Sequence, residues 1–280
     1  MTRSVVAIAA RAMAVLVAAA GAAAHAQPVA VVTDVRGGAT LGAAGAPAAI
    51  LGQVSAGDRI GLPDGARVSL LYYTSGAQFD ARGPGAIVID AARPRPEQGA
   101  AVAPRTAGPA PAPRLAPGGL VQGALVMRSL GLRIATPESQ VLSLRPPLAW
   151  TDSRADATYD VALIDAAGTR LFEATTPERR AVLPDALALK PGASYALEVK
   201  ARVGGAVVQV ARAEFVVAPD DLRAQARALA PAADADVADR VAYALWLDQN
   251  ALLDEAQRWW VDLARARPEQ GALRGRAGVR

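Results

Sequence analysis

The stretch GDRIGLPDGARVSLLYYTSGAQFDARGPGAIVID (57–90) sets short apolar runs between closely spaced glycine turns. Apolar and polar side chains alternate over residues 67–73, which is the period-two pattern of a β-strand. Pro63-Asp64-Gly65 has the composition of a tight turn, since proline presets φ and glycine tolerates a positive φ. Together these signals predict an antiparallel β meander or small sandwich over about residues 28–90.

The residues upstream of that stretch continue the same pattern. VAVVTDVRGGATL (29–41) is typical of two strands joined through a pair of glycines, Gly37-Gly38. Taken with the segment 57–90, it resembles the periplasmic FecR-like domain family. The resemblance is carried by residues that lie where that family's pattern places its turns, namely Gly57, Asp58, Gly65, Gly76 and Gly85. It implies an antiparallel β module of the cell envelope.

The first 26 residues have the layout of a secretory signal peptide. Arg3 and Arg11 give a positive start, a small-apolar stretch follows, and Ala24-His25-Ala26 is an A-x-A cleavage site. The apolar stretch is shorter than the ~20 residues that span a bilayer. We therefore expect cleavage after Ala26 and a soluble, exported periplasmic protein with no membrane span in the mature chain.

Composition restricts the chemistry open to the mature chain. There is no cysteine, and the single histidine, His25, lies in the leader. The side chains that serve most readily as general base, thiolate nucleophile or soft metal ligand would therefore be missing. Two groups of carboxylates remain. The first group, which we interpret as turn or strand-flanking residues, is Asp152, Asp156, Asp160 and Asp165. The second group, which we interpret as helix-capping residues, is Asp234, Asp236 and Asp239. We expect no enzyme, no cofactor and no metal site.

The charge balance argues against nucleic acid as a partner. The chain has 30 basic and 26 acidic residues, and two of the basic ones, Arg3 and Arg11, belong to the leader. The remaining arginines are scattered, whereas nucleic-acid binders gather basic residues on one face. We expect protein partners instead.

A change of composition divides the mature chain. AARPRPEQGAAVAPRTAGPAPAPRLAPGG (91–119) holds seven prolines and almost no large apolar residue. Such a segment is typical of an extended, semi-stiff spacer. We therefore predict a Pro-rich linker at 91–119 between the β unit at 28–90 and a second β unit at 129–218.

The second unit resembles a fibronectin type III or immunoglobulin-like sandwich. The segment LKPGASY (189–195) is similar to the tyrosine-corner sequence of that class, in which a buried tyrosine hydroxyl bonds nearby backbone. Trp150 stands on an expected strand just before the alternating segment TYDVALID (158–165). The resemblance implies that Tyr195 and Trp150 belong to the core, although Trp150 as a carbohydrate-stacking platform is the alternative.

Helical patterns follow in a third unit, 219–268. Asp220 and Asp221 after Pro219 signal a helix start, and two further helices are predicted over 234–248 and 251–267. The last pair resembles one tetratricopeptide-like helix hairpin, through Ala244, Ala256, Trp260 and Pro268. Such a hairpin is expected to pack on the sandwich or on a partner.

One residue of this hairpin is the candidate partner-binding site. Trp259 lies off the apolar stripe of its helix, on the side of Arg258 and Asp262, and tryptophan is enriched at interface hot spots. Packing against the neighbouring sandwich is its other interpretation.

The sequence thus predicts a mainly β protein with an α-helical C-terminus: a FecR-like β domain, an Fn3-like sandwich and a helical hairpin. We expect a non-catalytic exported envelope protein that acts as an adaptor or protein-interaction module. A periplasmic sensor or regulator of a membrane signalling system is the alternative, and a cell-wall carbohydrate binder is a weaker one.

The leader generates the first testable prediction. Mass spectrometry of the exported protein should find Gln27, in open or cyclised form, as the first residue, because the A-x-A site places the cut after Ala26. Recovery of an intact Met1 terminus in the membrane fraction would contradict it.

Overall fold

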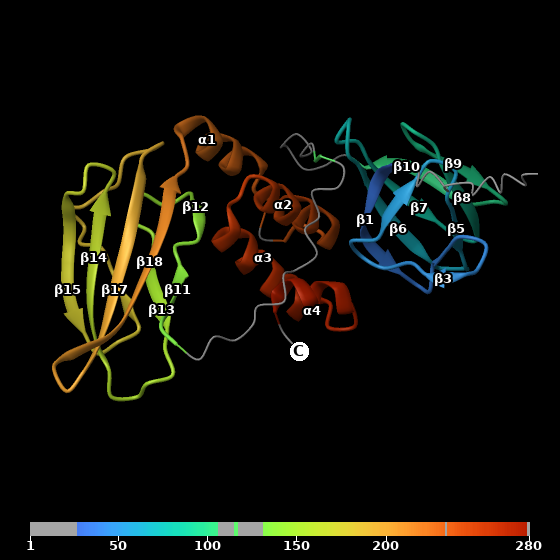
Figure 1. Ribbon diagram of the computed structural model, residues 1–280. Coiled ribbons are helices and arrows are strands. Elements are labelled where there is room, and N and C mark those ends of the chain that lie inside the picture. Colours follow the sequence, from blue (N-terminus) through green and yellow to red (C-terminus); the bar gives the residue numbers. More distant parts are fainter. Residues whose placement is uncertain (1–26, 106–114, 117–130, 233, 279–280) are drawn as a thin grey trace, which may run out of the picture.

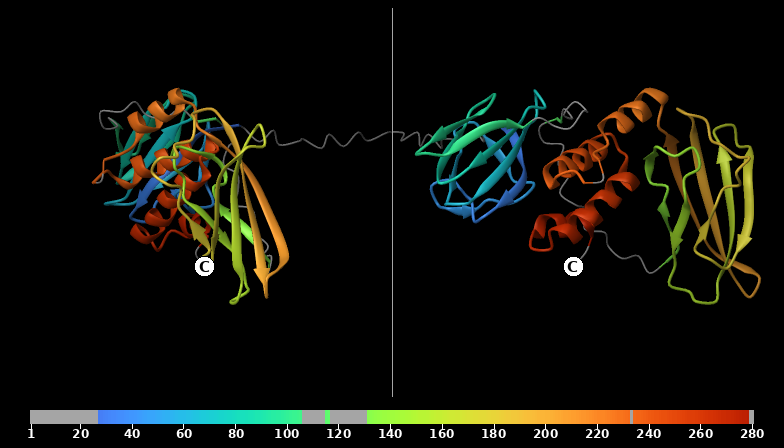
Figure 2. Two further views of the ribbon diagram at one scale, coloured as in Figure 1. Left: turned by 90° about the vertical axis from the view of Figure 1, so that its left-hand side faces the viewer. Right: turned by 180° about the vertical axis from the view of Figure 1, so that it is seen from behind.

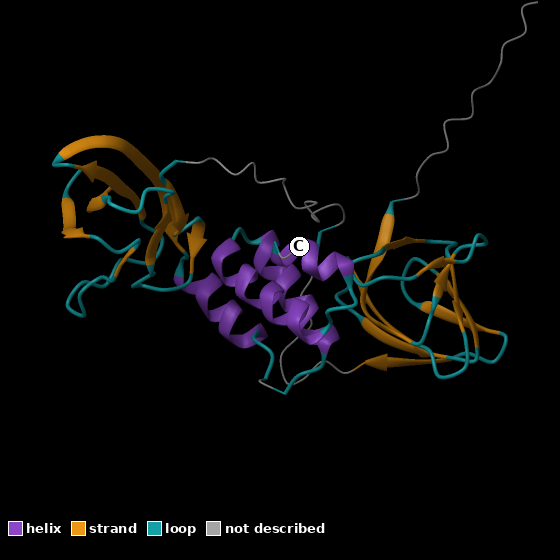
Figure 3. Cartoon of the chain, turned by 90° about the horizontal axis from the view of Figure 1, so that it is seen from below, coloured by secondary structure: helices purple, strands orange, loops and turns teal. Residues whose placement is uncertain are grey.

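The computed structural model describes residues 27–105, 115–116, 131–232 and 234–278. These residues form two β units with a layer of four helices between them (Figure 1). Seen from below, the helices lie in the middle with strands at both ends (Figure 3). The mainly β fold class with a helical C-terminus is confirmed. Within the described residues, no helix is long and apolar enough to cross a membrane.

The first β unit consists of two five-stranded antiparallel sheets. One sheet has the order β10-β7-β6-β1-β4 and comprises β1 (Pro28–Arg36), β4 (Gln53–Ser55), β6 (Arg67–Tyr72), β7 (Gln78–Arg82) and β10 (Ala101–Arg105). The other has the order β3-β2-β5-β8-β9 and comprises β2 (Thr40–Leu41), β3 (Ala46–Pro47), β5 (Arg59–Leu62), β8 (Gly85–Ile89) and β9 (Pro94–Glu97). The strands predicted on either side of Gly37-Gly38 are present, but they belong to different sheets.

The predicted linker at 91–119 is wrong in its first part. β9 pairs with β8 and β10 pairs with β7, so the first unit continues to Arg105. Both are edge strands, which is why they accept Pro94, Pro96 and Pro104: an edge strand needs ladder hydrogen bonds on one side only. The prolines of residues 94–104 therefore lie in edge strands of the sheets and not in a spacer. Beyond Arg105, only residues 115 and 116 of the predicted linker lie within the described part of the chain.

The second β unit is a sandwich of a three-stranded and a five-stranded sheet. The smaller has the order β11-β13-β16, with β11 (Arg133–Thr136), β13 (Leu148–Thr151) and β16 (Arg180–Ala181). The larger has the order β12-β18-β17-β14-β15, with β12 (Ser139–Val141), β14 (Thr158–Asp165), β15 (Arg170–Thr176), β17 (Ser194–Val203) and β18 (Ala206–Val217). Apart from the parallel pair β12 and β18, all pairs are antiparallel. This division of strands is that of an immunoglobulin-like or fibronectin type III-like sandwich.

The core of this sandwich confirms both residues predicted from the sequence. Trp150 is 3% exposed and meets the ring of Tyr159 edge to face, with centroids 5.3 Å apart. Tyr195, at the start of β17, is also buried, and its hydroxyl accepts a hydrogen bond of 2.9 Å from the backbone N–H of Lys190. The Lys190–Tyr195 bond is the tyrosine corner that the sequence resembled.

Four helices make the third unit: α1 (Asp220–Leu229), α2 (Val237–Gln249), α3 (Leu253–Ala266) and α4 (Gly271–Ala277). The first three were predicted, and α4 lies beyond the predicted end at residue 268. Its sequence GALRGRA contains two glycines, so local helix propensity argues against it. Tertiary contacts hold it instead: Leu273 is fully buried, and Arg276 pairs with Asp248 at 2.6 Å while lying over the ring of Trp260.

Helix α2 is apolar on nearly all sides, with nine of its thirteen residues buried. A helix of this kind needs cover on every side. It packs on β1 and β6 of the first unit and on α3, and a single buried cluster runs through the first β unit and the helices. The sequence predicts that the hairpin packs on the sandwich or on a partner. In the structure its larger contact is instead with the first β unit, because β1 and β6 cover the apolar surface of α2, while α3 contacts β12 of the sandwich.

Ion pairs frame this contact. Arg105 donates to Asp236 at 2.8 Å and to Asp239 at 2.9 Å, and Arg267 pairs with Asp34. Asp236 occupies the N-cap position of α2 but makes no capping hydrogen bond through its side chain. The prediction that these carboxylates cap the helix is therefore wrong for Asp236, whose Oδ2 accepts a hydrogen bond from Arg105 of the first β unit instead.

The opposite side of the helical layer holds the second β unit. Thr136 donates its hydroxyl to Asp254 at 2.8 Å, and the backbone N–H of Leu142 donates to Glu255 at 2.9 Å. The backbone N–H of Gln140 also donates to the carbonyl of Ala251 at 3.2 Å. Seen from behind, the helices fill the space between the two β units (Figure 2). The helical unit therefore lies between the two β units and contacts both of them.

The tyrosine corner generates a stability prediction. Tyr195→Phe should lower the free energy of unfolding by roughly 1–3 kcal/mol, because the Lys190 N–H loses its acceptor. Trp150→Ala should lower it by about 3–5 kcal/mol through the cavity it leaves. Urea unfolding followed by circular dichroism measures both.

A matched control is Ser194→Ala, at the exposed neighbour of Tyr195, which should stay within about 0.5 kcal/mol of wild type. Equal unfolding curves for all four proteins would contradict the assigned core.

Candidate interaction surface

The outer face of the larger sheet in the second unit is the candidate site. Alternation along β14 sends Tyr159, Val161 and Leu163 into the core and turns Asp160 and Ala162 outward. The same alternation in β17 turns out Ala196, Glu198, Lys200 and Arg202. We call the surface formed by these outward side chains, with those of β15 and β18 beside them, the open face.

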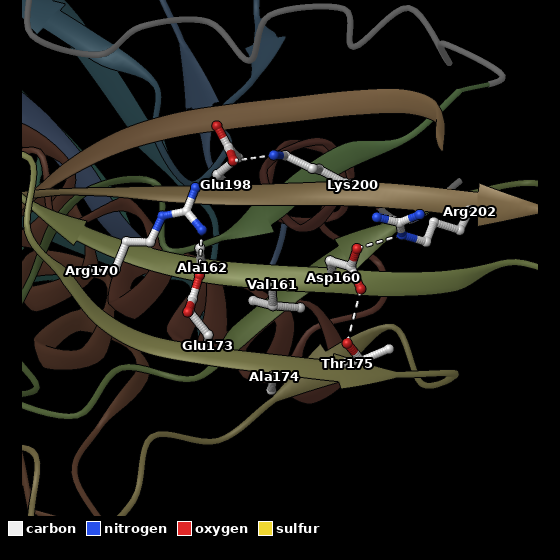
Figure 4. A pocket seen from close by; sticks show the side chains of 10 residues that line it. All are labelled: Asp160, Val161, Ala162, Arg170, Glu173, Ala174, Thr175, Glu198, Lys200 and Arg202. Carbon is white, nitrogen blue, oxygen red and sulfur yellow. Dashed lines mark hydrogen bonds and ion pairs between the residues drawn. The ribbon is translucent and has the colours of Figure 1, made fainter. Parts of the chain in front are cut away.

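Charged side chains on the open face are paired with one another (Figure 4). Arg202 donates to Asp160 at 2.5 Å, and the hydroxyl of Thr175 donates to the other oxygen of Asp160 at 2.9 Å. Lys200 pairs with Glu198 at 3.2 Å on the same strand. Arg170 and Glu173 form a further pair on the edge strand β15.

Small side chains between these pairs leave the open face hollowed. Ala162, Ile164 and Ala196 form a buried cluster of their own on this side of the sheet. Two hollows lie over it, of about 540 Å³ and 560 Å³, and both are lined by Arg170 and Glu198. The result is a trough with a small-apolar floor and walls that carry both signs of charge.

The Asp160 carboxylate, which lines one of the two hollows, is held in its charged form. The hydrogen bond from Arg202, and after it that from Thr175, lowers the pKa of Asp160 below its ordinary value. A general acid needs a raised pKa, so Asp160 does not have the environment of one. Both of its oxygens are bonded within the open face, one to Arg202 and one to Thr175.

Exposed valines lie on β18, where Val210 pairs in register with Lys200 of the open face and Val207 with Arg202. Val207, Val208 and Val210 of β18 are 45%, 47% and 51% exposed, and three of the five large apolar side chains that are exposed in the described residues thus lie on one strand. Clustered exposed apolar groups mark interaction surfaces. The sequence carries this signal in the run AVVQV (206–210).

The predicted site residue, Trp259, lies elsewhere. It is half-buried on α3, packs against the shared cluster, and meets the ring of Tyr243 edge to face at 5.3 Å. Tyr243 belongs to α2, so this ring contact lies within the helical layer. Its role toward a partner stays a prediction.

The first group of carboxylates is dispersed by the fold. Asp152 is buried and pairs with Arg154 at 2.9 Å, Asp160 lies on the open face, and Asp165 accepts turn N–H groups from Ala167 and Thr169. Among the residues that the structure describes, no group of acidic side chains is arranged to hold a metal ion.

Comparison with known proteins adds little to this picture. No family model matches the chain, and no curated protein matches it. A crystal structure of FN3tt is 15% identical with a TM-score of 0.23, covering 31% of this chain and 90% of that one. The chicken CNTN1 FN1-FN3 domains are 12% identical with a TM-score of 0.26, covering 70% of this chain and 58% of that one. The BSP domain of a biofilm associated protein is 14% identical with a TM-score of 0.22, covering 70% and 25%. At such scores the sandwich assignment rests on the strand order and on Tyr195.

The paired carboxylate predicts a pH dependence. Asp160→Asn should lower the free energy of unfolding by up to about 1 kcal/mol at pH 7, because the Asp160–Arg202 pair is partly exposed. The pKa of Asp160 is lower in the folded state, so this stabilisation is complete above the unfolded value of about 3.9 and is lost as the pH falls through the folded value. Urea unfolding at pH 7 and at successively lower pH checks it.

Arg202→Gln removes the partner of the same pair and also a hydrogen bond to the Gly205 carbonyl, so it should lose at least as much stabilisation, with the pair's share lost over the same pH range. A difference between wild type and Asp160→Asn that persists unchanged at acid pH would contradict the assignment.

Proposed function

We propose that the chain is a non-catalytic exported protein of the cell envelope that acts as an adaptor or protein-interaction module. The single observation that carries the proposal is the open face: a hollowed sheet surface with paired charges and exposed valines on β18. Trough and valines together offer a partner both directional polar contacts and apolar area. Such a combination suits a protein surface, since interfaces join an apolar centre to a polar rim.

The position of the helical unit between the two β units supports an adaptor function. The helical unit contacts both β units through Arg105 and Arg267 on one side and Asp254 and Glu255 on the other. A partner held on the open face is thereby kept at a set distance from whatever the first β unit binds. The exported compartment is proposed from the signal-peptide layout of the first 26 residues.

The finer family assignments are part of the proposal. In favour of a FecR-like first unit, Gly57, Gly65, Gly76 and Gly85 all have positive φ, as turn glycines require. In favour of a tetratricopeptide-like hairpin, Ala244 and Ala256 are fully buried between α2 and α3, which suits the small residues of such a repeat.

Trp259 is a second contact point under this proposal. Its indole is half-buried against Tyr243 and keeps a solvent-facing part, so a partner can add cover without unfolding the helix pair. A periplasmic sensor that reports to a membrane signalling system is the alternative function, favoured by the FecR-like resemblance. Cell-wall carbohydrate is the weaker one, since Trp150, the candidate stacking platform, is a core residue.

Proximity labelling in the native periplasm, followed by capture with the mature chain, tests the proposal. We expect Ala162→Arg, which fills the floor of the trough, to lower recovery of the labelled partner at least ten-fold while the circular dichroism spectrum shows that the chain stays folded. Ala188→Arg, at an exposed position outside the open face, is the matched control and should bind as wild type does.

Equal recovery by Ala162→Arg and wild type would remove the open face as the binding surface. Labelled proteins consisting of membrane signalling components would favour the sensor over the adaptor, and binding of peptidoglycan alone would overturn the protein-interaction proposal.

A further inference from the structure

A short piece of the chain's own Pro-rich segment is docked on the helical unit. Leu115 is 4% exposed and belongs to the buried cluster shared by the helices and the first β unit. Ala116 beside it is exposed. One leucine side chain is therefore buried from a segment whose composition alone could not form a core.

The side chain of Gln249, the last residue of α2, binds the backbone next to this leucine. The N–H of Ala116 donates to Gln249 Oε1 at 2.9 Å, and Gln249 Nε2 donates to the carbonyl of Ala116 at 3.0 Å. Both polar groups of one peptide residue are thus satisfied by a single amide, as a neighbouring strand would satisfy them. This recognition needs no particular side chain at position 116.

We propose that this place on the helical unit, which we call the leucine site, is a peptide-binding site that the chain occupies with its own Leu115-Ala116. Its ligand is an extended segment of a partner protein with a leucine followed by a small residue and proline. The leucine supplies the buried contact and Gln249 binds the main chain. Ala116 precedes Pro117, and a residue before proline is restricted to extended conformations, so little entropy is lost on binding.

Occupancy by the chain itself makes the site self-inhibited. A tethered segment acts at an effective concentration of about the millimolar range, so a partner peptide has to compete with it. Removing the resident leucine should free the site. The inference concerns the helical unit and is independent of the open face, so either can fail without the other.

The experiment measures binding of a fluorescein-labelled synthetic peptide, APAPRLAPGG, which corresponds to residues 110–119. Fluorescence anisotropy compares the mature wild-type chain with its Leu115→Asp variant, in which a buried charge would displace the segment. We expect the variant to bind the peptide at least ten-fold more tightly than wild type. Leu115→Ala, a milder change, provides the same comparison if the aspartate variant fails to fold by circular dichroism.

Two matched controls make the result specific. The peptide APAPRDAPGG should show no binding to Leu115→Asp, and Gln249→Ala added to that variant should weaken binding of the leucine peptide about ten-fold, as two lost hydrogen bonds would. Failure of the folded variants to bind the leucine peptide overturns the proposal, as does equal binding of the aspartate peptide. A wild-type dimer in analytical ultracentrifugation, with no peptide binding by the variants, overturns it in favour of exchange between two copies.

Discussion

A helix that is apolar on nearly all sides is the constraint on which the rest of the structure depends. Nine of the thirteen residues of α2 are buried, so α2 cannot remain folded with one side in water. The first β unit covers one side through β1 and β6, and α3 covers another. Because α3 in turn contacts β12 of the sandwich, covering α2 also joins the two β units. The arrangement of three units in one molecule follows from that requirement.

This constraint also decides which sheet faces are covered by other parts of the chain. One sheet of the first unit packs on the helices, and Arg105 and Arg267 form ion pairs at the edge of that contact. The sandwich, held through its β11–β12 side, keeps the larger sheet's outer face exposed. On that face, Asp160 and Arg202 form an ion pair, and Lys200 pairs with Glu198 beside them. The charges of the open face are therefore arranged in pairs of opposite sign.

Local chemistry accounts for what could be predicted from the sequence. The turn glycines, the strand alternation, Trp150 and the Tyr195 corner depend on neighbouring residues, and all lie where their patterns indicated. The edge strands β9 and β10 were missed because proline content signals a spacer, and pairing with β8 and β7 is a long-range event. Helix α4 was missed because its two glycines disfavour a helix. Its residues Leu273 and Arg276 hold it in place through contacts with parts of the chain that are distant in sequence.

The sequence by itself determined the three kinds of unit and a composition with one histidine and no cysteine, because composition and short-range periodicity encode these. The tertiary structure alone decided which residues meet. Asp236 pairs with Arg105 and does not cap its helix, and the ring of Trp259 contacts the ring of Tyr243. Likewise, Asp160 lies on the open face with Thr175 and Arg202, residues 15 and 42 positions away. Contacts over such separations depend on how the sheets and helices pack, and no local pattern specifies that.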